Sequence, residues 1–157
     1  MPSTGKRVDP AFERDLLHFW ALLFQVVLDG EKRLSDMLGQ HGLTTPQFYV
    51  LKTLIEHDGR LTIGRLAKLH GLTNATMTGL VKRLELFDPP LVLREVNHED
   101  RRSVYVVLTD AGRERFIGVQ TDLMDQLRAV LGLLNADERR SLLFDLTRYV
   151  DMLILRA

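Results

Sequence analysis

The chain has 157 residues, 45% of them hydrophobic, which is enough for a folded core and argues against intrinsic disorder. Its 21 basic and 21 acidic side chains balance, and the lack of cysteine excludes disulfides, thiol-based redox sensing and cysteine-ligated zinc. The sequence has neither an uncharged apolar run of about 18 residues nor a secretory signal in residues 1–10, so we expect a cytoplasmic protein.

Basic residues are concentrated in the middle of the chain. Residues 60–115 carry 10 basic and 7 acidic side chains, a net charge of +3, whereas residues 1–59 have a net charge of −2 and residues 116–157 of −1. A DNA-contacting lobe between two acidic flanks would show this distribution, although many solvated surfaces have a similar excess.

The first predicted element is a long helix over residues 9–40. Asp9 and Pro10 form an N-cap and a first-turn proline, and apolar residues then recur at steps of three and four. They occupy two sides of the helix: Phe12, Leu16, Phe19, Trp20, Leu23, Val26 and Val27 on one, and Leu17, Phe24, Leu28, Leu34 and Leu38 on another. Since one small core cannot cover both sides, the pattern predicts a partner chain.

Three shorter helices are predicted next. Thr44 and Gln47 have capping-box spacing and begin a helix that ends near residue 57. A second helix spans residues 62–70. A third spans residues 73–87 and ends before Asp88-Pro89-Pro90, because proline cannot continue the helical hydrogen bonds.

Residues 62–84 fit a helix-turn-helix motif. Ala67 is small where the two helices must cross closely, and Gly71 stands where the turn needs a permissive backbone. The alternative is a pair of ordinary packed helices. The predicted shared core of the motif consists of Leu66, Leu72, Met77 and Leu80.

The helix over residues 73–87 is predicted to present a polar and basic face to a major groove. Threonine can bond base edges or contact a thymine methyl, Arg83 can pair with guanine or phosphate, and Lys82 suits a phosphate. Gly79 either permits a close approach of the backbone to DNA or reflects tight packing or drift on an exposed face. The residues predicted to contact DNA are Thr73, Asn74, Ala75, Thr76, Thr78, Gly79, Lys82 and Arg83.

Two stretches rich in β-branched residues, 91–96 and 104–108, predict strands joined by a charged hairpin loop. A basic hairpin tip beside the recognition helix could reach a minor groove, whose negative potential attracts arginine. Thr109 then caps a fifth helix, and Asn135 with Glu138 opens a sixth. The sixth helix is apolar nearly all round, so it must be buried, and we expect it at a subunit interface.

The stretch from Asp100 to Thr109, DRRSVYVVLT, resembles the D-x-R…L-T signature of the MarR family, the multiple antibiotic resistance regulators. Residues 61–85 look like the helix-turn-helix of that family, and the order of six helices with a wing matches it over nearly the whole chain. One departure is the Asp88-Pro89-Pro90 link, which is longer and stiffer than the glycine-containing link usual in the family. The wing angle is therefore less defined than the wing itself.

The resemblance implies an obligate dimer built by the first, fifth and sixth helices. It also implies that Arg102 and Arg101 probe the minor groove, and that Asp100 holds an arginine in position by an ion pair. The alternative is that Asp100 and Arg102 only stabilise the hairpin.

We therefore predict a mainly α fold with a small β wing (α+β), comprising six helices and a two- to three-stranded antiparallel sheet. Residues 42–115 would form a winged helix-turn-helix DNA-binding lobe, and residues 9–41 and 116–157 a helical dimerisation lobe. The predicted function is a homodimeric transcriptional regulator, a repressor, on a pseudo-palindromic double-stranded DNA operator. The alternative is a winged-helix protein-interaction module that does not bind DNA, which the zero net charge keeps open.

The resemblance also implies a possible effector, since many members of the family release DNA in response to small aromatic or phenolic acids. A cation beside aromatic rings would suit a carboxylated aromatic. The alternative is that each candidate is an interface, core or solvated residue. The candidates to line such a site are Arg14, His18, Trp20, Tyr49 and Lys52.

No cofactor, metal or catalytic residue is predicted. The five histidines are scattered, and none has the i, i+4 spacing of a helix-borne metal pair, which disfavours the zinc-sensing branch of the family. The sequence contains neither a glycine-rich phosphate loop nor a G-x-S-x-G elbow, so we do not expect an enzyme.

Overall fold

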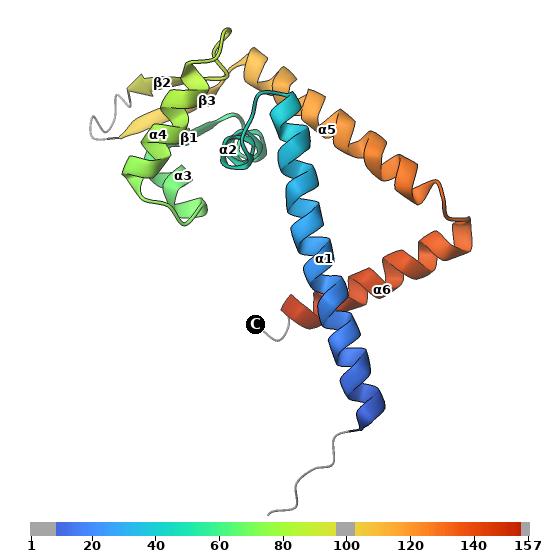
Figure 1. Ribbon diagram of the computed structural model, residues 1–157. Coiled ribbons are helices and arrows are strands. Elements are labelled where there is room, and N and C mark those ends of the chain that lie inside the picture. The colour runs from blue at the N-terminus through green and yellow to red at the C-terminus, as the bar shows by residue number, and fades with distance from the viewer. Residues whose placement is uncertain (1–8, 97–102, 155–157) are drawn as a thin grey trace, which may run out of the picture.

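The computed structural model describes residues 9–96 and 103–154. Its elements are α1 (Pro10–Gln40), α2 (Thr45–Glu56), β1 (Arg60–Thr62), α3 (Ile63–Leu69), α4 (Asn74–Glu85), β2 (Val92–Val96), β3 (Val104–Leu108), α5 (Asp110–Leu131) and α6 (Ala136–Ile154). The elements from α2 to β3 gather into one winged lobe, from which α1 and α5 extend (Figure 1). The helix α6 runs from the far end of α5 back to α1, and these three helices are the arms. The predicted six helices and small antiparallel sheet are confirmed.

Side-chain caps set the helix starts that the sequence predicts. The carboxylate of Asp9 accepts a hydrogen bond from the backbone N–H of Ala11 at 3.0 Å. The backbone N–H of Thr44 donates to the side-chain oxygen of Gln47 at 2.8 Å, as expected for a capping box. At its other end α4 stops at Glu85, slightly before the predicted limit, because the prolines that follow disfavour helical conformation in the residues that precede them.

The sheet has the order β1-β3-β2, with β3 antiparallel to both neighbours. Its register aligns Leu61, Val106 and Arg94 in one row, and Val106 is completely buried on the face that meets the helices. Because successive strand residues point to opposite faces, all three positions of that row belong to the inner face. The sequence allowed two or three strands; β1 has only three residues, too few to show the alternation that predicts a strand.

The hydrophobic core lies in the winged lobe, and the end of α1 and the start of α5 close it. Ala67 is buried, as predicted for the place where the two helices cross. Gly71 has a φ of +63°, which confirms that the turn needs a permissive backbone. Leu72 was predicted in the shared core, and this prediction is wrong, because its side chain is 37% exposed. Its backbone N–H closes the end of α3 on the carbonyl of Ala67 at 2.9 Å, which leaves the side chain at the rim of the core.

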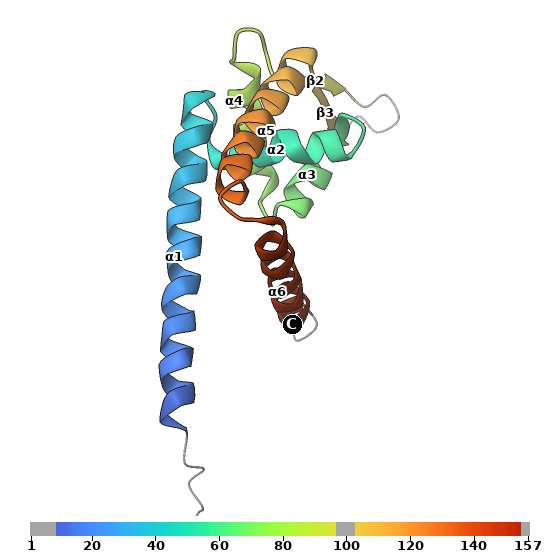
Figure 2. The ribbon, with the colours of Figure 1, turned by 90° about the vertical axis from the view of Figure 1, so that its right-hand side faces the viewer.

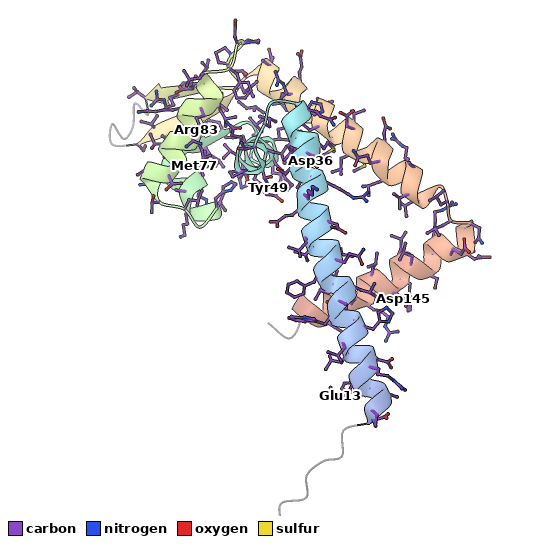
Figure 3. The ribbon with its side chains drawn as sticks, in the orientation of Figure 1. Glu13, Asp36, Tyr49, Met77, Arg83 and Asp145 are labelled. Atoms are coloured by element: carbon purple, nitrogen blue, oxygen red, sulfur yellow. The ribbon has the colours of Figure 1, made fainter. Side chains whose placement is uncertain are left out.

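The arms carry many exposed apolar side chains. All residues from 9 to 22 of α1 are exposed, and no described side chain of α6 is buried. In Figures 2 and 3 the lower half of α1 and the whole of α6 stand clear of the winged lobe, with Glu13 and Asp145 marking them. The two arms meet where the rings of Phe19 and Tyr149 lie 5.2 Å apart. No helix in the described part of the chain is long and apolar enough to cross a membrane.

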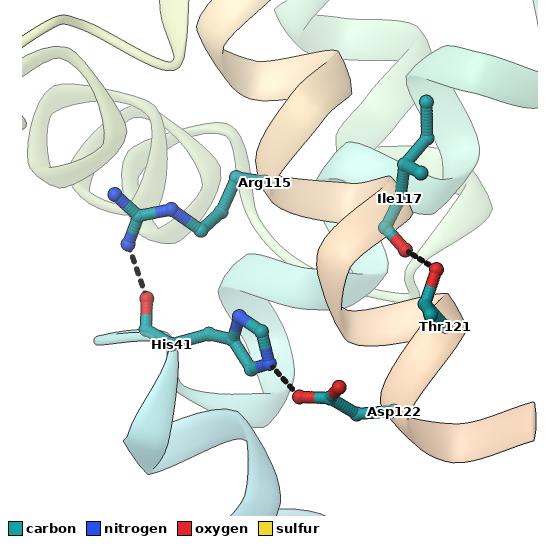
Figure 4. A network of polar contacts seen from close by, with 5 residues as sticks. All are labelled: His41, Arg115, Ile117, Thr121 and Asp122. Atoms are coloured by element: carbon teal, nitrogen blue, oxygen red, sulfur yellow. Dashed lines mark hydrogen bonds and ion pairs between the residues drawn. The ribbon is translucent and has the colours of Figure 1, made fainter. Parts of the chain in front are cut away.

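The arms join the winged lobe at His41, the residue that ends α1 (Figure 4). Its ring nitrogen Nε2 lies 2.7 Å from Oδ2 of Asp122 in α5. The guanidinium of Arg115 donates to the backbone carbonyl of His41 and lies over the ring of Phe87, 5.5 Å from its centroid. The end of α1, the middle of α5 and the link after α4 are therefore held together at one place.

The first turn of α5 lies directly on the start of β2. The Thr109 hydroxyl donates to the carbonyl of Pro90 at 2.6 Å, and the Thr109 N–H donates to the carbonyl of Leu91 at 3.2 Å. Gly112 stands over the same backbone, where a Cβ atom would lie 2.1 Å from the oxygen of Leu91. A side chain at this position would force α5 away from the sheet.

We therefore expect Gly112→Ala to destabilise the fold by about 3 kcal/mol, since the clash is with backbone that cannot rotate away. Gly39→Ala is the matched control, because nothing lies within 4 Å of a Cβ at that helical position. The control should be neutral or more stable by up to about 1 kcal/mol. Denaturant unfolding of both variants measures the difference, and equal stability of the two would contradict the close approach.

Candidate nucleic-acid interface

The helix α4 has one buried and one solvent-facing side, as the sequence predicts. Met77, Val81 and Leu84 are completely buried, and Leu80 is nearly so. The opposite side is open at Thr73, Asn74, Ala75, Thr76, Lys82 and Arg83, and half-buried at Thr78 and Gly79. Figure 3 shows Met77 and Arg83 on this helix. The eight predicted residues therefore share one accessible surface, the α4 face.

The threonines of the α4 face already make hydrogen bonds within the chain. The hydroxyl of Thr73 caps the helix by accepting from the backbone N–H of Thr76 at 3.2 Å, and the two hydroxyls lie 2.9 Å apart. The hydroxyl of Thr78 donates to the carbonyl of Asn74 at 2.7 Å. Thr78 thus offers a nucleic acid its methyl group and its oxygen as an acceptor, while the proton of its hydroxyl is committed.

The exposed cations of the helix-turn-helix have no ion-pair partner among the described residues. Lys82 and Arg83 are exposed, and the six ion pairs found among the described residues involve neither of them. The same holds for Arg65 and Lys68 on α3, which the sequence analysis missed. Their position was predictable, because the first helix of such a motif crosses the phosphate backbone. The helix-turn-helix therefore carries four exposed cations, two on α3 and two on α4.

Gly79 occupies open space. Apart from its two chain neighbours and the adjacent backbone of its own helix, no described residue has an atom within 4 Å of the position that a Cβ would take. Tight packing inside the chain, one of the two explanations for this glycine, is therefore excluded. The close approach of a nucleic acid and simple drift on an accessible face are the readings that remain.

Contacts on the outer face of the sheet hold the strands of the wing together. On the outer face the guanidinium of Arg60 pairs with Glu95 at 3.2 Å and lies 4.1 Å above the ring centre of Tyr105, which links all three strands. The predicted tip residues Asp100, Arg101 and Arg102 lie outside the described residues. The structure therefore describes the strands of the wing but not these three residues.

The residues predicted to bind an aromatic acid lie in two separate places. Arg14, His18 and Trp20 are on the exposed half of α1, where the Trp20 ring packs on Phe24 at 4.6 Å. Tyr49 and Lys52 are on α2, which adjoins the other end of α1. Because a helix rises about 1.5 Å per residue, roughly 30 Å of α1 separates Trp20 from His41. Within one chain the five residues do not form a common site.

A histidine contact closes the helix-turn-helix against α2. Nε2 of His70, at the end of α3, lies 3.0 Å from the hydroxyl of Thr53, whose backbone carbonyl is 2.9 Å from Nδ1 of His57. Desolvation by burial lowers the pKa of the His70 imidazole. The neutral imidazole is therefore the form that fits the folded winged lobe.

Protonation of His70 should destabilise the winged lobe in mildly acidic solution. Because its pKa is lower in the folded chain than the ordinary value of 6.5, the unfolded chain takes up the proton first as the pH falls. The contribution of neutral His70 to the free energy of unfolding should therefore be complete above about pH 6.5 and decline below that pH. We expect His70→Gln to flatten the dependence of the melting temperature on pH between pH 7.5 and pH 5. An unchanged slope in this variant would show that other groups cause the dependence.

Residues 43–104 match the family model for the MarR family. The HTH-type transcriptional regulator SarZ of Staphylococcus epidermidis is 31% identical over 121 residues, which cover 76% of this chain and 77% of SarZ. The HTH-type transcriptional regulator TtmR of Methylorubrum extorquens is 36% identical over 122 residues, which cover 78% of this chain but only 60% of TtmR.

Solved structures show the same architecture. A mutant of MepR from Staphylococcus aureus, solved bound to an oligodeoxyribonucleotide, has a TM-score of 0.66 and 25% identity, with 85% of this chain and 97% of MepR covered. The similarity extends over both the winged lobe and the arms, as the predicted order of elements requires. With its winged helix-turn-helix, this chain belongs to the MarR family of transcriptional regulators.

Proposed function

We propose that the chain is a homodimeric, sequence-specific DNA-binding repressor that recognises a pseudo-palindromic operator. Residues 42–115 form the DNA-binding lobe in this proposal, and residues 9–41 and 116–157 the dimerisation lobe. The observation that carries it is the α4 face, a polar and basic surface opposite a fully buried side of the same helix. A dimer seated on promoter DNA represses by excluding other proteins from the site it covers.

The α4 face suits a major groove in both size and chemistry. Its first two turns present only small side chains, so the helix can enter deeply, and Lys82 and Arg83 follow where the helix would leave the groove. Arg65 and Lys68 on α3 would contact flanking phosphates. The relatives SarZ and TtmR are named as HTH-type regulators, and MepR was solved on DNA, which supports this reading.

The exposed apolar surface of the arms supports a dimer. Phe12, Leu17, Trp20 and Val26 are each more than half exposed in the single chain, and α6 adds Leu143 and Phe144. Between α1 and α5 an open groove is lined by Leu34, Met37, Leu123, Leu127 and Val130, among others. An exposed apolar surface of this size marks a protein interface, and in this family we expect a second copy of the chain to bury it.

We also propose that a small aromatic or phenolic acid releases the DNA. Arg14, His18 and Trp20 are far from Tyr49 and Lys52 within one chain, so a site that uses all five needs residues from two chains. Such a site would exist only in the dimer. In the same proposal, Arg101 and Arg102 contact the minor groove, and an ion pair with Asp100 holds one of these arginines in position.

Selection of bound sequences from random duplexes tests the proposed function. We expect an inverted repeat whose half-sites are about 10 bp apart, because two symmetric recognition helices enter successive major grooves. The logarithm of the affinity should fall with the logarithm of salt concentration by about 0.9 for each phosphate contacted. Sedimentation of the free protein should give a dimer. Failure to enrich any sequence would favour the protein-interaction module instead.

Gly79→Ala separates the two readings of that glycine. Alanine should raise the stability of the free protein by up to about 1 kcal/mol, because it is the better helix former and meets open space. If DNA lies against this position, the same change should weaken operator binding about tenfold by crowding the groove. Gly39→Ala, equally open but outside the helix-turn-helix, should leave Kd unchanged. If the Gly79→Ala variant binds the operator as tightly as the unmodified protein, neutral sequence drift explains the glycine.

A further inference from the structure

An arginine occupies an inward-facing position in the first wing strand. Along β2 the side chains alternate, and Val92 is completely buried on the inner face. Arg94 follows two residues later on the same face, in the row that contains Leu61 and the buried Val106. An apolar residue would suit this position, since it faces the core. A cation at this position can reach an acid on the inner side of the sheet.

The partner is the last residue of the recognition helix. Nε of Arg94 lies 2.8 Å from Oε2 of Glu85, and the two side chains are 38% and 21% exposed. Glu85 comes two residues after Arg83 on the same helix, close to where phosphates would lie. An acid at that place repels DNA unless it is neutralised, and Arg94 supplies the charge that neutralises it.

The ion pair adds a second connection between α4 and β2. The first is a backbone hydrogen bond just before the strand, from the N–H of Leu91 to the carbonyl of Leu84, at 3.1 Å. β2 is also paired with β3 along its whole length, and its first residue, Val92, is buried in the core, so the start of the strand is firmly held. The Glu85–Arg94 pair lies three residues further along the chain, about 10 Å of extended strand, and therefore ties the middle of β2 directly to the end of α4.

We propose that Glu85 and Arg94 are positioning residues that set the angle of the wing relative to the recognition helix. This inference rests on the proposed DNA-binding function. The link 86–91 joins the two elements without a helix or strand of its own. The pair holds β2 so that the wing tip and the α4 face engage neighbouring grooves at the same time.

Glu85→Gln distinguishes positioning from a simple effect of charge. Removal of an acid beside the DNA should tighten binding if charge alone matters. If the pair positions the wing, the affinity for the selected operator should instead fall about fivefold. A partly exposed ion pair contributes at most about 1 kcal/mol, and that free energy corresponds to a fivefold change in Kd. Glu56→Gln, which breaks the Lys52–Glu56 pair in α2, is the matched control and should leave Kd unchanged. Unchanged or tighter binding by the Glu85 variant overturns the proposal.

The effect must also depend on the wing tip. In an Arg102→Ala background the wing has lost its predicted groove contact, so Glu85→Gln should cost no further affinity. Purely structural damage to α4 would weaken binding by the same factor in both backgrounds and would also lower the melting temperature. Equal factors in the two backgrounds therefore overturn the proposal, and a single-background effect at an unchanged melting temperature supports it.

A measurement without DNA keeps this inference separate from the proposed function. The chain has no cysteine, so Lys82→Cys and Val96→Cys place two spin labels on the exposed side of α4 and the exposed end of β2. Labelled chains are diluted with unlabelled protein so that only distances within one chain are measured. Glu85→Gln should broaden this distance distribution, and Glu56→Gln should not. An unbroadened distribution overturns the proposal, even if the unmodified protein binds DNA as expected.

Discussion

The close approach of α5 to the start of β2 is the constraint on which the rest of the structure depends. Gly112 leaves no room for a side chain over the oxygen of Leu91, and the hydroxyl of Thr109 bonds the carbonyl of Pro90 beside it. The wing strand β3 ends at Leu108, and α5 begins within two residues. The wing, the link after the recognition helix and one arm therefore meet at a single rigid point.

The distribution of apolar residues explains why the fold needs two kinds of surface. The winged lobe buries its core together with the end of α1 and part of α5, and its exposed sides are mostly polar or charged. The arms do the reverse, since α1 and α6 expose large apolar side chains along most of their length. A chain that is neutral overall thus combines a lobe that has a buried core and a basic face with arms whose apolar surface needs a cover. Composition averages over these two parts, which is why the net charge conceals the basic face.

Local signals predicted the elements well, and contacts between distant residues escaped them. Caps at Asp9 and Thr44 fixed helix starts, because a cap depends on residues only a few positions apart. The exposure of Leu72 depends on the bend at Gly71, and helical periodicity cannot represent a bend. The ion pair between Arg94 and Glu85 could not be predicted, because the sequence does not show that the two residues lie opposite each other. The α4 face was predicted from periodicity, but the hydrogen bonds of its threonines were not.

The joint at His41 suggests how a change in the arms would reach the DNA. His41 ends α1, its ring pairs with Asp122 of α5, and its carbonyl accepts from Arg115, which in turn lies over Phe87 beyond the recognition helix. In a dimer the arms set the distance between the two recognition helices, and a pseudo-palindrome tolerates little variation in that distance. A small rotation of α1 against α5 would act at this joint, and the winged lobe, closed around its own core, would follow as one body.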